Sequence, residues 1–480
     1  MVAFRQGERS IARPQWLAGI YTERCESDSG ICHEDSASTQ MISEKQLPEL
    51  RTYRRLEGTM PVESLPGFER LVVPGANERL PVHRWFRFKE AFSADLLKTL
   101  LESLELSGRK SLRILDPFCG VGTTLLSAQE LSKSIAITAL GIERNPFIHS
   151  VAQTKVRWPE MNPDTIMEIG KRILKASLSS VIEIPRLSSL TTGRCMSRHL
   201  AGRLLSVRDA VRSDGVSANH DALILGLAAS VEQLSKIRKD GRALRIVTKS
   251  RQTANNVLLD RWREIASDVR FMQQTVPNAP IPTVALGDGR SIADHEVEAS
   301  SIDLILTSPP YPNNIDYSEV YKLELWLLGF VNDQKEFLQL RRSTFRSHPT
   351  IVLPQLPDDF RDLIAKGTLR DVLGPILRRT QSSSERYRHR VILGYALDLW
   401  MTLRQQFRCL RKNGVAVFVV GNSLHGGKHL PYVIPTDLLV SILGCAVGFE
   451  VDRVAIARNF RRRLSGNHFL RESVVVLRKE

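Results

Sequence analysis

The stretch SLRILDPFCGVGTTLLSAQEL, residues 111–131, has the pattern of a buried strand, a glycine turn and a helix. The segment AITALGIERNPF, residues 136–147, follows as a second strand that ends in an acid. Together the two segments predict a β-α-β unit of the Rossmann kind. Further strand patterns, at 281–290, 301–311, 415–423, 450–460 and 472–479, alternate with helical ones. We therefore expect an α/β protein whose mostly parallel sheet carries helices on both faces.

The composition indicates a basic, globular protein. The 480 residues include 67 Lys+Arg against 52 Asp+Glu, and the formal net charge of +15 favours a polyanionic partner such as nucleic acid or a membrane surface. Six scattered cysteines show no zinc-type spacing, so neither a metal site nor a disulfide framework is expected. The chain shows no signal-peptide pattern and no run of 18 apolar residues, which predicts a cytoplasmic protein without membrane spans.

Changes in polarity and hydrophobic periodicity divide the chain into segments. Residues 1–80 are polar and lack periodicity, which predicts a poorly ordered N-terminal extension. The α/β domain is expected to comprise residues 81–158 and 281–480. Residues 159–280 predict a helical insertion, and residues 331–390 a second, basic insertion within the α/β domain. An amphipathic helix before Asn413 is expected to end at Asn413-Gly414.

Several residues at predicted strand ends can form a binding crevice. Asp116 ends the first strand, and Gly120 and Gly122 let the backbone turn sharply and approach a ligand. The helix that follows presents unpaired N–H groups to an anionic group. Glu143 ends the second strand, where a carboxylate can accept both hydroxyls of a ribose, and Asp288 occupies a comparable strand end. Three acids in one crevice would suit an adenosine with a cationic, amino-acid-like tail.

These motifs carry a family resemblance. DPFCGVGTT followed by GIERNPF, LGDGRS and TSPPY resembles the class I, S-adenosylmethionine-dependent amino-methyltransferases of DNA, and the SPPY form is most similar to the cytosine-N4 branch. The match covers residues 81–158 and 281–330 well, and 391–480 more loosely. The resemblance implies a Rossmann-like class I methyltransferase sheet with an antiparallel last strand, and S-adenosyl-L-methionine as the cofactor. It also implies cofactor-binding roles for Phe88, Phe118 and Thr123.

The corner TSPPYPNN, residues 307–314, provides chemistry that suits this reaction. An exocyclic amino group is a poor nucleophile because its lone pair is delocalised into the ring. The Ser308 hydroxyl and the Pro309 carbonyl can accept the amino hydrogens and hold the lone pair toward a methyl donor. Pro309 and Pro310 restrict the direction of that carbonyl. Tyr311 offers a flat face to a flipped-out base, so we expect Ser308, Pro309, Pro310 and Tyr311 to be catalytic.

Double-stranded DNA is the expected partner. Residues 186–270 hold 16 Arg+Lys against 8 Asp+Glu, and residues 331–390 hold 12 against 7, so either insertion could contact phosphates. The stretch RNFRRRLSGNH, residues 458–468, is a further basic patch. Residues 159–280 are our candidate target-recognition region. The resemblance also allows a cognate restriction or defence protein as a second partner.

Other functions remain open from the sequence. Ser308 favours cytosine N4 over adenine N6, although the two amino groups are chemically similar. Methylation at carbon 5 would need a Pro-Cys dipeptide, which the chain lacks. An RNA base methyltransferase is an alternative, since the same corner could serve guanine N2. A nucleic-acid-binding module without activity is a third reading, against which the complete set of motifs argues.

Overall fold

The computed structural model describes residues 46–177, 194–239, 244–250, 252–313, 315–381, 386–426, 431–460 and 469–480. Several sequence predictions fall in part outside these residues. They concern residues 1–45 of the N-terminal extension, residues 178–193, 240–243 and 251 of the helical insertion, Asn314 of the quoted corner, residues 382–385 of the second insertion and residues 461–468 of the last basic patch.

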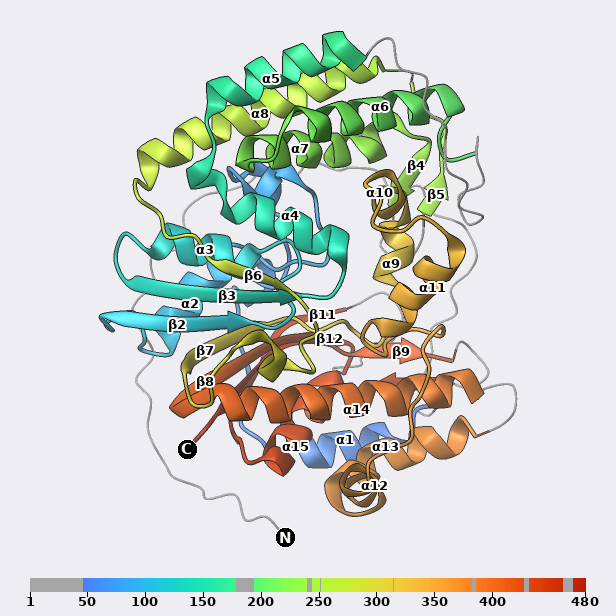
Figure 1. Ribbon diagram of the computed structural model, residues 1–480. Coiled ribbons are helices and arrows are strands. Elements are labelled where there is room, and N and C mark those ends of the chain that lie inside the picture. Colours follow the sequence, from blue (N-terminus) through green and yellow to red (C-terminus); the bar gives the residue numbers. More distant parts are fainter. Residues whose placement is uncertain are drawn as a thin grey trace.

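An eight-stranded sheet forms the centre of the protein, in the order β1-β11-β12-β8-β7-β2-β3-β6 (Figure 1). Every neighbouring pair is parallel except those made by β12, which runs antiparallel to both β11 and β8. This is the Rossmann-like class I arrangement with an antiparallel last strand, so the predicted fold class is confirmed. The strands are β1 Val62–Ser64, β2 Ser111–Asp116, β3 Ala136–Glu143, β6 Thr283–Leu286, β7 Ile302–Thr307, β8 Leu410–Gly421, β11 Glu450–Asn459 and β12 Arg471–Arg478.

Two apolar cores cover the two faces of the sheet. Successive strand residues point to opposite faces, so Ile114 of β2 joins one core and Leu115 joins the other. Helices α2, α3 and α4 pack in the first core, and α1, α13, α14 and α15 in the second (Figure 1). These helices are α1 Leu50–Glu57, α2 Asp95–Ser103, α3 Thr123–Leu131, α4 Pro146–Val156, α13 Gly367–Arg379, α14 Arg386–Cys409 and α15 Thr436–Val447.

The order of the strands determines where a ligand can bind. From β2 the chain proceeds outward to β3 and β6, and then returns to β7 on the other side of β2. In open α/β sheets the crevice at such a switch point, beyond the carboxyl ends of the strands, is the usual binding place. The glycine turn follows β2 and the SPPY corner follows β7, so the fold brings both motifs to this crevice.

Residues 159–280 contain the expected helices, which form the upper part of the view in Figure 1. Trp262 is fully buried there, and a Cβ at Gly170 or Gly226 would lie 2.6 Å from its ring. These two glycines therefore let three helices close on one tryptophan. The elements are α5 Pro163–Ala176, α6 Arg198–Asp214, α7 Ala218–Leu234, α8 Ala254–Thr275 and the antiparallel strands β4 Ile237–Lys239 and β5 Leu244–Ile246.

The segment after the SPPY corner is also largely helical. It contains α9 Tyr317–Val320, α10 Lys322–Leu327, α11 Gln334–Ser343 and α12 Asp358–Ala365, and a small hairpin, β9 Ser423–His425 with β10 Tyr432–Ile434, follows β8. Two arginines of the second basic insertion form ion pairs with aspartates of the same protein. Arg341 pairs with Asp316, and Arg346 pairs with Asp398.

The structure differs from the sequence predictions at two places. The described part of the expected extension, residues 46–80, is folded: Leu50 and Tyr53 of α1 are buried, and β1 pairs in parallel with β11 at the edge of the sheet. Helix α14 ends at Cys409, before the expected stop at Asn413-Gly414, because Leu410 already pairs with Ile302 of β7. In both cases contacts distant in sequence override the local pattern.

Candidate functional site

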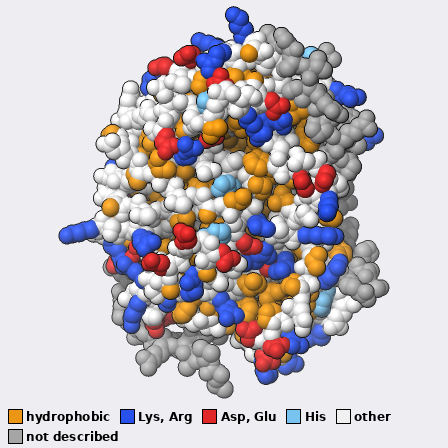
Figure 2. Space-filling model, in the orientation of Figure 1, with side chains coloured by type: hydrophobic (Ala, Val, Ile, Leu, Met, Phe, Trp, Pro, Cys, Tyr) orange, Lys and Arg blue, Asp and Glu red, His pale blue; other side chains and the backbone are white. Residues whose placement is uncertain are grey.

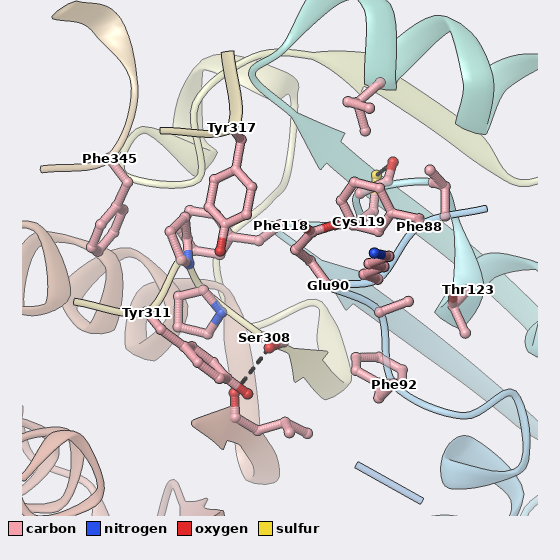
Figure 3. Close-up of a pocket in the computed structure, with 18 of the residues that line it drawn as sticks. Phe88, Glu90, Phe92, Phe118, Cys119, Thr123, Ser308, Tyr311, Tyr317 and Phe345 are labelled. Carbon is pink, nitrogen blue, oxygen red and sulfur yellow. Dashed lines mark hydrogen bonds between the residues drawn. The ribbon is translucent and has the colours of Figure 1, made fainter. Parts of the chain in front are cut away.

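A cavity of about 350 Å³ lies at the carboxyl ends of the central strands. Figure 3 shows Ser308 and Tyr311 on one side of it and Phe88, Glu90 and Thr123 on the other. All but one of the site residues expected from the sequence line it: Phe88, Asp116, Phe118, Gly120, Thr123, Glu143, Asp288, Ser308, Pro309, Pro310 and Tyr311. The exception, Gly122, precedes α3 with a φ of 86°. The fold thus joins the two motifs in one cavity.

Asp116 holds the backbone of the glycine turn through hydrogen bonds. Its carboxylate accepts hydrogen bonds from the Phe118 N–H at 3.1 Å and from the Thr124 hydroxyl at 2.6 Å. Burial raises the pKa of Asp116 to about 6, although these two hydrogen bonds oppose the shift. Gly120 has a φ of 53°, and a Cβ there would lie 3.2 Å from the Phe88 ring. Glycine is therefore favoured both by the left-handed backbone and by the close approach of Phe88.

Glu143 lies at the end of β3 beside this turn. Its Oε2 accepts the Gly120 N–H at 3.1 Å, and its Oε1 accepts the Asn145 N–H at 2.7 Å. Burial raises the pKa of Glu143 to about 7, against the opposing effect of these hydrogen bonds. Each carboxylate oxygen can accept more than one hydrogen bond, so the group remains able to accept the hydroxyls of a ribose.

Asp288 reaches the cavity, but its carboxylate is also held by a cation. Arg290 binds it through Nε, at 2.9 Å from Oδ1, and through Nη2, at 2.6 Å from Oδ2. Burial alone would raise the pKa of Asp288, but the hydrogen bonds and charge of Arg290 hold it below its ordinary value. Arg290 also contacts Asp398, at 2.9 Å. Arg290 therefore anchors the loop after β6 to α14, while Asp288 orients Arg290 and lines the cavity.

The SPPY corner is fixed by contacts with the last two central strands. The Ser308 hydroxyl donates to the Val419 carbonyl of β8 at 3.0 Å. The Tyr311 hydroxyl donates to Glu472 of β12 at 2.8 Å. A Cβ at Gly421 would lie 2.8 Å from the Tyr311 ring, so that ring packs directly on the glycine backbone. The corner is thus held at both its serine and its tyrosine.

The cavity lining also includes residues that were not expected as site residues, among them Glu90, Tyr317, Phe345, Arg458 and Glu472. Glu90 lies within HRWFRFKEAF, residues 83–92, a segment before α2 whose aromatic residues already stand out in the sequence. The other four come from α9, from the segment after α11 and from the two last strands. Arg458 belongs to the basic stretch 458–468, but no local pattern marks any of the four as a residue of this cavity, because only the tertiary fold brings these segments together.

The cavity fits S-adenosyl-L-methionine. Its volume of about 350 Å³ is in the range of small-molecule sites. Asp116 and Glu143 supply acceptors for hydroxyl and cationic groups, while Phe88 and Phe118 supply apolar walls. A Cβ at Gly289 would lie 2.4 Å from the Pro117 carbonyl, so the loops after β2 and β6 meet closely around this end of the cavity.

Over most of its length the chain is similar to known methyltransferases. No protein-family model matches the chain. Over 470 residues, the chain is 27% identical to the type II methyltransferase M.BsoBI of Geobacillus stearothermophilus, with 87% of this chain and 90% of that protein covered. It is 25% identical over 449 residues to the type II methyltransferase M.AvaI of Anabaena variabilis, with 84% and 88% covered.

These relatives are type II methyltransferases. Their similarity extends over most of both chains rather than over one motif. It supports the predicted class of enzyme and S-adenosyl-L-methionine as its cofactor.

Two solved structures show only weak likeness. An rRNA methyltransferase of Streptomyces viridochromogenes, aviRa, is 10% identical with a TM-score of 0.29, and 81% of this chain and 85% of that chain are covered. A Thermus thermophilus protein in complex with S-adenosyl-L-methionine is 17% identical with a TM-score of 0.20, and 40% and 53% are covered. Likeness at this level adds nothing to the assignment, which rests on the strand order and the relatives.

On the face shown in Figure 2, charged side chains are scattered rather than clustered. Figure 2 shows Lys and Arg distributed over the visible face together with Asp and Glu, without one dominant basic patch on that face. Among the described residues, no cluster of His, Cys, Asp and Glu side chains could hold a metal ion. Within the same residues, no helix has the length and apolar character that a membrane crossing needs.

Proposed function

We propose that this protein is a DNA methyltransferase that transfers a methyl group from S-adenosyl-L-methionine to the exocyclic N4 of a flipped-out cytosine. The type II methyltransferase relatives support the reaction class. The observation that carries the proposal is the hydrogen bond of Ser308, which lines the same cavity as the glycine turn.

Ser308 is suited to accept hydrogen bonds from an amino group. A hydroxyl has one donor hydrogen and two acceptor lone pairs. The Val419 carbonyl can only accept, so it takes the Ser308 hydrogen. The Ser308 oxygen can then only accept from a substrate, which favours the amino groups of cytosine and adenine over the carbonyl of thymine at the same ring position.

The corner supports transfer without a strong base. Bound S-adenosyl-L-methionine supplies an electrophilic sulfonium methyl. The Ser308 oxygen and the Pro309 carbonyl accept the two amino hydrogens and so hold the nitrogen lone pair out of the ring plane. Tyr311, fixed against Gly421, offers its ring to the base. The amino group becomes cationic during transfer and releases its proton afterwards, so a neutral serine is sufficient.

The other expected residues have roles on the cofactor side. Glu143 accepts the ribose hydroxyls, and Asp116 keeps the glycine turn in shape. The N-terminus of α3, just after Gly122, offers its N–H groups to an anionic group. Phe88 and Phe118 close the cavity over the cofactor, as the family resemblance implies for Phe88.

Residues 159–280 are the proposed target-recognition region. Arg238 and Arg245 lie opposite each other on β4 and β5, and both side chains are exposed. In the second basic insertion, Arg341 and Arg346 are committed to internal ion pairs. The first insertion thus offers a pair of exposed arginines to DNA phosphates.

The first test is mass spectrometry of nucleosides from genomic DNA of cells that express the wild-type protein or Ser308→Ala. We expect N4-methylcytosine with the wild type and a large loss with the variant, while cofactor affinity stays nearly unchanged. Ser301→Ala is a matched control, because Ser301 precedes the same strand and its hydroxyl donates to the Glu298 carbonyl, away from the cavity.

Other outcomes would redirect the proposal. N6-methyladenine in place of N4-methylcytosine would keep the mechanism and change the base. Methylated RNA with unmodified DNA would favour the RNA alternative. An equal loss of cofactor binding and turnover in Ser308→Ala would contradict the role given to Ser308. Whether a cognate restriction or defence protein acts beside this enzyme is a separate proposal, tested by the cutting of unmodified DNA in the native host.

A further inference from the structure

A β-bulge brings Arg458 to the cavity. Ile456 of β11 pairs with Ser473 of β12, but the next paired residue of β11 is Arg458, which lies opposite Glu472. In regular pairing Ala457 would stand opposite Glu472, so Ala457 is the extra residue of the bulge. Bulges of this kind often re-aim a side chain beside an active site. Arg458 and Glu472 both line the cavity that contains the SPPY corner.

Arg458 is held in a defined orientation. Its Nε donates to Oε2 of Glu472 at 2.6 Å, and Oε1 of the same carboxylate accepts the Tyr311 hydroxyl at 2.8 Å. The guanidinium also lies over the Phe460 ring, at 5.1 Å from the ring centre. Glu472 is only 4% exposed, so this carboxylate is a rigid link between the guanidinium and the tyrosine that faces the base.

We propose that Arg458 is the base-selecting residue of the site, and that it recognises the ring acceptors of cytosine. This inference rests on the proposed function. Among the described residues, Glu472 engages the guanidinium through Nε, which leaves the two Nη groups as the outer donors of the fork. A cytosine whose N4 amino group lies at Ser308 presents two acceptors on the same edge, N3 and O2. A guanidinium matches such a pair of acceptors in a bidentate way.

The same contact discriminates between the bases. Adenine also presents an amino group to Ser308, but its edge continues with one acceptor, N1, followed by a C–H group. Thymine presents a carbonyl where Ser308 needs a donor. Ser308 therefore selects for an amino group, and Arg458 adds the distinction between cytosine and adenine that the SPPY corner alone does not make. Glu472 is a positioning residue, since it acts through Arg458 and Tyr311.

The test compares the purified wild type with Arg458→Lys and Arg458→Met on unmethylated genomic DNA, with N4-methylcytosine and N6-methyladenine measured by mass spectrometry. In both variants the rate of N4-methylcytosine formation should fall by roughly 5- to 150-fold, the value of one bidentate base contact. N6-methyladenine should make up a larger fraction of the methylated bases. Calorimetric S-adenosyl-L-methionine affinity should stay within about twofold of wild type. Arg453→Lys is the matched control, because Arg453 lies on the same strand and pairs with Asp452.

A coupling measurement tests the positioning role. Glu472→Gln keeps a side-chain oxygen that can accept the Tyr311 hydroxyl but loses the carboxylate that holds Arg458. It should therefore show part of the Arg458→Lys defect, and the double variant should be no worse than Arg458→Lys alone, provided thermal melting shows that both fold. Full activity of Arg458→Lys, together with a lower salt dependence of DNA binding in Arg458→Met, would mean a phosphate contact and would overturn the inference. The proposed function has its own readout. If the wild-type protein makes no N4-methylcytosine, the proposed function is wrong, and so is the role inferred for Arg458.

Discussion

Lys239 connects the helical insertion to the wall of the cavity. Its side chain is 8% exposed, and its ammonium donates to the fully buried Glu324 of α10 at 2.5 Å. The ammonium also lies 4.4 Å from the ring centre of Tyr321. Tyr321 stacks on Phe88 with 5.7 Å between ring centres, and its hydroxyl donates to Glu90. Phe88 and Glu90 line the cavity, so a continuous set of contacts runs from the insertion to the cofactor side.

Lys239→Met should destabilise the protein strongly. The variant keeps most of the side-chain volume but leaves the Glu324 carboxylate buried without its cation. Breaking a buried ion pair in this way costs about 3–5 kcal/mol of unfolding free energy. Removing both charges, in Lys239→Met with Glu324→Gln, should recover most of this loss, since the desolvation of both ions is then avoided. Lys236→Met, at an exposed lysine of the same segment, should change the unfolding free energy by less than about 0.5 kcal/mol.

Urea denaturation gives the free energies, and titration calorimetry gives the affinity for S-adenosyl-L-methionine. We expect Lys239→Met to weaken cofactor binding, because Tyr321 then loses a contact that holds it against Phe88. The double variant should separate the two effects: stability should return, while cofactor affinity stays reduced. The reasoning would be refuted if Lys239→Met lowered the free energy of unfolding by less than about 1 kcal/mol. It would also be refuted if that variant bound the cofactor as tightly as the wild type does.

Three other predictions concern the site itself. Tyr311→Ala should weaken DNA binding by about 1–3 kcal/mol in fluorescence anisotropy, the usual value of a base–aromatic contact, with cofactor affinity unchanged. Asp116→Ala should lower cofactor affinity in calorimetry more than turnover at saturating cofactor, because the Phe118 N–H loses its acceptor. Cofactor affinity should fall as the pH drops through about 7, since protonated Glu143 accepts ribose hydroxyls less well, and Glu143→Gln should remove this step while leaving the one that follows the pKa of Asp116, about 6. A wild-type affinity that is the same about one pH unit below and above the pKa of Glu143 would contradict the last prediction.

The same raised pKa affects stability in the absence of ligand. Folding raises the pKa of Glu143 from 4.5 to about 7, so the folded state binds the proton more tightly than the unfolded state. The stabilising contribution of this proton is therefore present at low pH and is lost as the pH rises through about 7. Cofactor binding favours the ionised carboxylate and should move in the opposite direction with pH.

The sequence was sufficient for features that depend on local patterns. The strands before Asp116, Glu143 and Ser308 are short apolar runs ended by turns, and the structure places each of them in the central sheet. Because parallel strands end at one edge, their terminal residues had to converge once the topology was right. This is why most of the expected site residues line a single cavity.

The sequence was not sufficient where partners are distant. The segment 46–80 looks irregular by itself, yet Tyr53 donates to the Val433 carbonyl, 380 residues away. Asp288 was expected at a strand end beside the crevice, and its place in an ion-pair network with Arg290 and Asp398 was not. Neither arrangement has a local signature, since each depends on which elements pack together.

The sequence by itself determined the strand ends, the glycine turn and the SPPY corner, because backbone propensity and turn chemistry act over a few residues. Only the tertiary structure decided that Arg458, rather than Ala457, lies opposite Glu472, and that Lys239 of the insertion reaches Glu324. Strand register and burial of a charge are set by the balance of many long-range contacts, so a bulge of one residue can bring a different side chain to the site.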